Sequence, residues 1–381
     1  MIDRNRLTET FLTLVRFDAE SFGERAISDW LRRRLEEIGL EVTEDDADAL
    51  CGRRSASSSG NLYGILRGNT AGEPILLSAH MDTVKPGIGK RPIIREDGTI
   101  TSDGTTVLGA DDAAGLAAIL EALTALAEDG VPHADVEVLF PVAEEIYGRG
   151  SAVFDYGRLR SHSAFCFDLT GRIGEAVTRQ PSILAVRVTV EGVAAHAGFN
   201  PEDGINALTA AARALARIPT GRVAPDTTVN FGTIAGGSVT NAVPARVTVG
   251  GEVRSLIHEE AVRRGEEIRA IFEEEARRIG ASAAVEITEM VRAFRTDPEA
   301  PVVRRFARAA HAVGVEPTFG VTFGASDLNH YAAHGLEGIV AASAMQNVHT
   351  VHEYTRIGDM ETCARLILAL AADRASAESD G

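Results

Sequence analysis

The chain of 381 residues is poor in cysteine and contains no long apolar run. Its three cysteines, Cys51, Cys166 and Cys363, are odd in number and far apart, which excludes a disulfide framework and a cysteine-based metal knuckle. The apolar runs are too short to cross a membrane, and the opening segment MIDRNRLTETFLTLVRFD is too charged for a signal peptide. We therefore expect a cytoplasmic protein with no membrane partner.

Positive charge is also scarce. The chain has 38 Lys and Arg against 55 Asp and Glu, a formal net charge of -17. No basic cluster with interleaved aromatic residues offsets this charge, so phosphate backbones are repelled and nucleic acid is excluded as a partner. Hydrophobic residues are plentiful at 45%, enough for a substantial core and for two or more domains.

Apolar strands alternate with helical patterns in the first half of the chain. The strand candidates are EPILLSAHMDTV, ADVEVLFPV and SHSAFCFDL, and the helix candidate between the first two is AAGLAAILEALTALAED. This order is typical of an α/β fold with a mostly parallel sheet covered by helices.

The pattern changes near residue 180. SILAVRVTVEG alternates strictly, as expected for a strand exposed on one side, and two helices and further strands follow. After residue 292 the buried, Ala-rich pattern returns. We predict a discontinuous domain of residues 1–179 and 292–381, with an inserted α+β domain of residues 180–291 that has an open sheet and two helices.

His80 and Asp82 lie in the first strand candidate, two residues apart. The strand period of two places them on one face, so that Asp82 can accept a hydrogen bond from one ring nitrogen while the other nitrogen faces a metal. An isolated pair of this kind is as often a core histidine whose hydrogen bond is satisfied by a nearby aspartate.

Carboxylates follow the other buried segments. Asp111 begins an apolar helix in LGADDAAG, Glu144 and Glu145 follow a strand in VEVLFPVAEEIYGRG, and Asp168 ends a strand in FCFDLTG. Each alone has an ordinary interpretation, as a helix cap, a solvated loop or a turn. Because the carboxyl ends of parallel strands converge, we expect these groups to meet His80 at one edge of the sheet.

Such a group of carboxylates would repel one another and raise each other's pKa values. Two Zn²⁺ ions would carry about +4, and three ligating carboxylates with one bridging hydroxide about -4, so a dinuclear metal site would be close to neutral. The sequence therefore predicts two divalent ions.

Seven motifs occur in the order known from one enzyme family: SAHMDTV, LGADDAAG, AEEIYGRG, FDLTG, AAHAGFNPEDGINAL, TNAVPARVTVGGEVRS and NVHTVHEY. Across nearly the whole chain the sequence resembles the dinuclear zinc peptidases that include peptidase T, carboxypeptidase G and aminoacylase. HMDTVKPG and SDGTTVLGADDAAG are most similar to the peptidase T branch, the tripeptide aminopeptidases. The resemblance implies hydrolysis of the N-terminal residue of short peptides by a metal-bridged hydroxide.

The resemblance also implies roles for individual residues. Glu144 would be the general base, and His352 a neighbour of the site, since the family's ligand lies four residues before a glutamate, here Glu353. Zinc is the expected metal, with cobalt or manganese as alternatives, because carboxylate and imidazole ligands suit all three. The implied ligands are His80 and Asp168 for one ion, Glu145 and His349 for the other, and Asp111 as the bridge.

In the inserted domain the resemblance marks His196, which would hydrogen-bond the oxyanion in the partner subunit of a homodimer, making the insert a dimerisation domain. Asn241 and Arg254 match substrate-binding positions, and Arg254 could pair with a peptide carboxylate. From the residues alone, His196 is equally well a loop histidine, and Arg254 a solvated strand-end residue.

Three departures from the family pattern leave the substrate open. Ala113 replaces a usual lysine, Tyr147 a usual glycine, and AASAMQNVHT a usually Gly-rich stretch. A deacylase or carboxypeptidase of the same fold is one alternative. A non-catalytic metal-binding scaffold is another, although a scaffold would have little need of Glu144.

Overall fold

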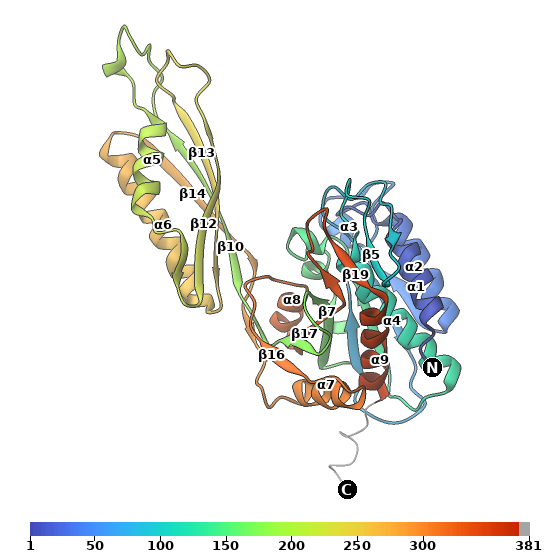
Figure 1. Cartoon of the computed structure of the whole chain (residues 1–381). Coiled ribbons are helices and arrows are strands. Elements are labelled where there is room, and N and C mark those ends of the chain that lie inside the picture. The colour runs from blue at the N-terminus through green and yellow to red at the C-terminus, as the bar shows by residue number, and fades with distance from the viewer. Residues whose placement is uncertain (373–381) are drawn as a thin grey trace. The chain divides into compact units, whose positions relative to one another are not determined.

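A computed structural model describes residues 1–372 of the chain, and the last residues of the predicted second segment, 373–381, lie outside the described residues. The chain forms two compact units (Figure 1). Unit 1 contains Met1–Arg179, Arg295–Val321 and the chain from Ser326 onward, and unit 2 contains Gln180–Phe294 and Thr322–Ala325.

The predicted boundaries assign every residue after 292 to one domain, whereas residues 322–325 group with unit 2 in the structure. The carbonyl oxygen of Phe323 accepts a hydrogen bond of 2.9 Å from Nη1 of Arg254, and the guanidinium of Arg222 lies 3.8 Å from the centre of the Phe323 ring. These contacts join residues distant in sequence, so no local pattern indicates them.

An eight-stranded sheet forms the centre of unit 1, and its four middle strands run parallel. Strands β2, β3 and β6 are buried along their whole length, as expected for short apolar runs covered on both faces. The predicted fold class is confirmed. In spatial order the strands are β1 (Glu41–Glu44), β2 (Leu62–Leu66), β6 (Val136–Phe140), β3 (Ile75–Ser78), β7 (Ser163–Leu169), β17 (Glu337–Ala342), β8 (Glu175–Val177) and β16 (Thr318–Gly320).

Helices cover this sheet, and in Figure 1 α1, α2, α4 and α9 lie on one side of it and α8 on the other. Helix α4 is buried on nearly every face, because its sequence is apolar all round. The helices of unit 1 are α1 (Arg4–Leu14), α2 (Arg25–Ile38), α3 (Ala47–Leu50), α4 (Ala110–Asp129), α7 (Pro301–Ala312), α8 (Leu328–Ala333) and α9 (Ile357–Ala372). A small second sheet contains β18 (Met345–Gln346), β19 (Tyr354–Arg356), β5 (Thr99–Thr101) and β4 (Ile93–Ile94).

Unit 2 is an antiparallel sheet with two helices, as the alternating pattern predicted. The side chains of Leu184, Val186, Val188 and Val190 are buried on one face of β10 and pack with α5 and α6. Its elements, with the strands in spatial order, are β11 (Gly221–Ala224), β12 (Thr227–Gly236), β13 (Arg246–Ser255), β10 (Ser182–Glu191), β14 (Ser282–Val291), α5 (Ala207–Arg217) and α6 (His258–Arg278).

The chain leaves unit 1 at β9 (Arg179–Gln180) and returns at β15 (Phe294–Arg295). Among residues 1–372, no helix combines the length and the apolar content needed to cross a membrane.

Candidate active site and metal centre

Three neighbouring strands of unit 1 carry the first site residues at one edge of the sheet. Strands β6, β3 and β7 are adjacent and parallel, so their carboxyl ends lie side by side. His80 follows β3, Asp168 lies near the end of β7, and Glu144 begins a 3₁₀ turn after β6.

Helix α4 brings Asp111 to this edge. Gly115 lies so close to β7 that a Cβ atom there would be 2.6 Å from the carbonyl oxygen of Phe167. The free N–H groups at the start of the helix donate to Glu353, from Gly109 at 2.7 Å and from Asp111 at 2.9 Å. Because Glu353 caps the helix, the carboxylate of Asp111 is left to face the two histidines.

The side chains of the sheet edge form two groups that share Asp111. In one, Oδ1 of Asp111 lies 3.0 Å from Nε2 of His80, which is 3.8 Å from Oδ1 of Asp168. In the other, Oδ2 of Asp111 lies 3.2 Å from Nε2 of His349, which is 3.0 Å from Oε2 of Glu145. Within each group the three ligand atoms lie within 4.8 Å of one another.

These residues fit a pair of divalent ions. The two oxygens of Asp111 point to different histidines, as a bridging carboxylate requires, and each group mixes imidazole with carboxylate. Among the described residues, the buried Oε1 of Glu145 has no hydrogen-bond partner, so it is available as a ligand atom.

The charges of the cluster also call for cations. Burial, together with the charge of Asp111, raises the pKa of Glu145 to about 7. Hydrogen bonds to Asp111 and Glu145 raise the pKa of His349 to about 10. Burial lowers the pKa of His80, but its hydrogen bonds to Asp111 and Asp82 more than offset this and leave it well above the usual value. The carboxylates therefore need positive charge beside them, which divalent ions supply.

Asp82 differs in detail from the sequence prediction. The nearest acceptor to Nδ1 of His80 is the main-chain oxygen of Asp82, at 2.9 Å, and its carboxylate is farther away at 3.4 Å. The carboxylate instead accepts the N–H of Glu144 at 2.8 Å, the N–H of Glu145 at 3.3 Å and the hydroxyl of Ser21 at 2.6 Å. Asp82 thus orients the ring of His80 and holds the turn that carries both glutamates.

That turn explains how adjacent glutamates serve one site. Strand β6 ends at Phe140, and the chain reaches Glu144 through Ala143, whose φ of 55° is in the left-handed region. Glu145 then contributes to the second ligand group, while Glu144 belongs to neither. Burial and the nearby charge of Asp168 raise the pKa of Glu144 well above its usual value.

Comparison with known proteins identifies the family. Residues 178–280 match the family model described as a peptidase dimerisation domain, and residues 61–185 match peptidase family M28. Protein YqjE of Bacillus subtilis is 35% identical over 370 residues, covering 97% of this chain and 98% of YqjE. The crystal structure of aminopeptidase PepT from Bacillus cereus is 36% identical and matches with a TM-score of 0.90, over 98% of this chain and 99% of that chain.

A tripeptidase from Staphylococcus aureus is 31% identical, with a TM-score of 0.93 over 98% of each chain. The chain belongs to the peptidase T family. It is therefore an enzyme, a metallo-aminopeptidase, and the family resemblance of the motifs is confirmed. The candidate ligand groups agree with a metal-dependent peptidase and do not identify the metal.

The loop before His349 has an unusual backbone. His349 itself has a φ of 62°, and Ala344 and Asn347 also have positive φ values. Left-handed backbone favours glycine, so these three residues occupy backbone positions that glycine would adopt more readily. The exposed His352 is in neither ligand group.

The other two departures lie next to the glutamate turn and next to Asp111, which belongs to both ligand groups. Tyr147 has a φ of 72°, a conformation that the glycine usual at this position of the peptidase T branch adopts without strain. Ala113 is buried in the first turn of α4.

The structure places the remaining predicted site residues of the peptidase in unit 2. His196 is exposed, and its Nδ1 accepts the N–H groups of Gly198 and Phe199, each at 3.1 Å. This assigns the ring proton to Nε2, which can donate outward. The main-chain oxygen of Asn241 accepts the N–H of Ala197 at 2.9 Å, so Asn241 lies beside the histidine loop.

Arg254 is not gathered with these two residues. It lies near the end of β13, at the opposite end from the Asn241 segment. Its guanidinium donates to both carboxylate oxygens of Glu252, at 2.7 and 3.1 Å, and to the carbonyl of Phe323. Within unit 2 the guanidinium is thus already paired with a carboxylate of the same strand, and its predicted role in substrate binding stays a prediction.

Three further buried carboxylates, not predicted from the sequence, contact the elements of the candidate site. Glu24 accepts the N–H of Ala143 at 3.0 Å, Asp327 accepts the hydroxyl of Ser151 at 2.5 Å, and Glu353 caps α4. Only Glu353 had a signal, its fixed spacing after His349. The other two contacts join residues more than a hundred positions apart, and no local motif marks them.

Proposed function

We propose that this metallo-aminopeptidase removes the N-terminal residue from short peptides, tripeptides above all, with two divalent ions, zinc in the first place. The observation that carries the proposal is the pair of ligand groups sharing Asp111, with Glu144 beside them and outside both. The printed names of the relatives, an aminopeptidase and a tripeptidase, support the choice of substrate. The free thiols of Cys51, Cys166 and Cys363 support a cytoplasmic location.

In this proposal His80, Asp168 and Asp111 would hold one ion, and Asp111, Glu145 and His349 would hold the other. Bound divalent ions would polarise the scissile carbonyl and lower the pKa of a water, so that the water can lose a proton and attack the carbonyl carbon. Glu144 takes the proton of that water on a carboxylate oxygen and returns it to the nitrogen of the leaving amine. Asp82 keeps Glu144 in place through the main-chain N–H of the turn.

We further propose that the enzyme is a homodimer, in which His196 donates from Nε2 to the oxyanion in the partner's active site, with Asn241 beside it. The match of residues 178–280 to a dimerisation domain supports this arrangement. Arg254 can take part in substrate binding only if its guanidinium leaves the carboxylate of Glu252.

Complementation tests the action of His196 across the dimer. Co-expression of His196→Ala with Glu144→Gln should restore about a quarter of wild-type activity, because half of randomly assembled dimers are mixed and each has one intact site. Each variant expressed alone should be nearly inactive. If the mixed preparation gains no activity although sedimentation shows mixed dimers, His196 does not act across the interface.

A substrate panel tests the reaction itself. We expect metal-reconstituted enzyme to release the N-terminal residue from free tripeptides and to refuse N-acetylated tripeptides, measured by mass spectrometry on one mixture that also contains dipeptides and N-acetyl amino acids. Chelation should abolish the turnover, because the ligand groups then hold no ions.

The same mixture distinguishes the alternatives. Turnover of N-acetyl amino acids in place of free tripeptides would make the protein a deacylase or carboxypeptidase of the same fold. Metal binding without turnover of any component would leave a metal-binding scaffold and would contradict the proposed function.

A further inference from the structure

The segment that carries Glu144 and Glu145 is a loop closed by its own backbone. The N–H groups of Gly148, Arg149 and Gly150 donate to the carbonyl oxygens of Glu144, Ala143 and Val142, at 2.8, 2.9 and 3.0 Å. The pair formed by Val142 and Gly150 is therefore the neck of this loop, and the place of the neck determines where the two glutamates lie.

Beyond the last pair of the sheet, the side chain of Asn61 bonds the two residues of the neck. The ladder between β2 and β6 ends at the pair Leu62 and Phe140, and Pro141, the next residue, has no N–H to continue it. The N–H of Val142 donates instead to Oδ1 of Asn61 at 3.1 Å, while Nδ2 of Asn61 donates to the carbonyl oxygen of Gly150 at 3.0 Å. One fully buried amide thus bonds both sides of the neck.

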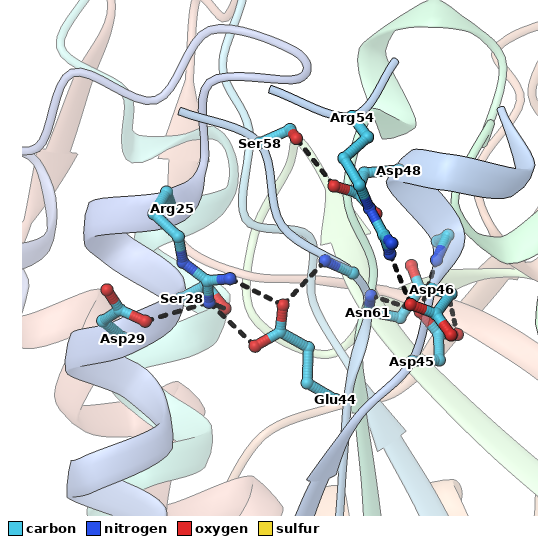
Figure 2. Close-up of polar contacts among 12 residues, drawn as sticks. Arg25, Ser28, Asp29, Glu44, Asp45, Asp46, Asp48, Arg54, Ser58 and Asn61 are labelled. Carbon is cyan, nitrogen blue, oxygen red and sulfur yellow. Dashed lines mark hydrogen bonds and ion pairs between the residues drawn. The ribbon is translucent and has the colours of Figure 1, made fainter. Parts of the chain in front are cut away.

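Asp45 determines which way that amide points. Its Oδ2 accepts Nδ2 of Asn61 and its Oδ1 accepts the main-chain N–H of Asn61, both at 2.8 Å, and Figure 2 shows the two side chains in contact. A flipped amide would place its oxygen against the carboxylate and its NH₂ against the N–H of Val142. Buried groups left unpaired in this way are costly, so the observed orientation is the only one that satisfies all partners.

The neck is also packed without spare room. A Cβ atom on Gly150 would lie 2.3 Å from Oδ1 of Asn61 and 2.4 Å from the carbonyl oxygen of Val142. The absence of a side chain at Gly150 is what allows the amide of Asn61 to reach both sides.

We propose that Asn61, oriented by Asp45, is a positioning residue of the active site, and that it holds the Glu144–Glu145 loop in register with the ligands from β3, α4 and β7. The inference rests on the roles proposed above for the two glutamates. The left-handed backbone of Ala143, with a φ of 55°, is unfavourable for a residue other than glycine, so it depends on the contacts that hold the neck.

Asn61→Ala tests the proposal, because it removes the hydrogen bonds of Asn61 to Val142 and Gly150 and changes none of the proposed metal ligands. We expect kcat for a tripeptide to fall by ~100-fold, as for a displacement of about 1 Å in a catalytic group, with KM within about twofold of wild type. Metal-free enzyme should bind Co²⁺ in two steps, and the step that His349→Ala lacks is the one that depends on His349. In Asn61→Ala the affinity of that step should fall by ~10-fold, while the affinity of the other step is unchanged. Hydrogen exchange at the amides of Val142 and Gly150 should accelerate.

Two further variants complete the experiment. Asp45→Asn keeps the shape of the side chain, and its Oδ1 can still accept the N–H groups of Asn61 and Ala47, while Nδ2 of Asn61 loses its carboxylate acceptor. It should therefore fold and show the same selective pattern with a smaller fall in kcat. Ser58→Ala is the matched control. It removes a buried hydroxyl that donates to Asp48 at 2.7 Å, a contact drawn in Figure 2, and the hydrogen bonds of this hydroxyl within the described residues go to Ser55 and Asp48, so kcat should stay within about twofold.

The proposal is overturned if folded Asn61→Ala or Asp45→Asn keeps wild-type kcat and both cobalt affinities. It is overturned as well if kcat, KM and both affinities decline together with thermal stability, which would mark a merely structural residue. Glu144→Gln, measured in parallel, separates this failure from failure of the proposed function, since full activity of that variant contradicts the role of the loop itself.

Discussion

Glu144→Gln is expected to lower kcat by ~10³-fold, within the range lost with a general base, and to leave KM within about threefold of wild type. Glutamine has the shape of glutamate but cannot take a proton at neutral pH. The main-chain N–H of residue 144 still donates to Asp82, so the turn should remain in place. Because Glu144 is in neither ligand group, elemental analysis should find the same metal content as in wild type.

Glu145→Gln is the matched control for this prediction, since it makes the same chemical change one residue further along the turn. Oε2 of Glu145 lies 3.0 Å from the ring of His349, so the loss of its charge should weaken one ion-binding group and lower the metal content. A Glu144→Gln enzyme with full metal content and full activity would remove Glu144 from the mechanism.

Much of the fold could be predicted because its causes are local. Strict alternation in SILAVRVTVEG places Leu184, Val186, Val188 and Val190 on the buried face of β10. The continuous apolar runs of β3 and β6 indicated strands covered on both faces. The convergence of His80, Glu144 and Asp168 followed from the same property, since residues that end adjacent parallel strands meet at one edge.

What could not be predicted depends on contacts between distant segments or on backbone conformation. Glu24 reaches the N–H of Ala143, and Asn61 bonds both Val142 and Gly150, and none of these pairs has a local pattern. The pairing of Arg254 with Glu252 was equally hidden, because alternation gives the face of a side chain and not its partner.

The backbone conformation of the two loops that carry Glu145 and His349 could not be predicted either. Ala143 and His349 both have positive φ values, which favour glycine, although neither is glycine. The motifs indicated the candidate residues of the site, and the tertiary contacts of the loops determine how those residues are placed.

Asp112→Asn is the control variant for Asp111→Asn, the change at the proposed bridging residue. Asp112 is buried beside Asp111, and its Oδ2 accepts the main-chain N–H of His80 at 3.2 Å. Asparagine has the same shape and keeps an oxygen that can accept this N–H, so it is a close replacement. We expect a loss of metal affinity of at most ~10-fold, as for a residue that supports a ligand without binding the ion.

Asp111→Asn should be far more damaging, with both cobalt-binding steps weakened by more than ~100-fold and no measurable peptidase activity at micromolar metal, because a supporting residue alone is worth 10- to 100-fold. Asp111 is the one residue common to both ligand groups, with Oδ1 toward His80 and Oδ2 toward His349. An amide has one oxygen and no charge, so it can serve one ion at most and leaves the imidazoles without their shared anion. The loss should appear in both steps of the titration, whereas Glu145→Gln should affect one, and unchanged metal content in Asp111→Asn would refute the bridge.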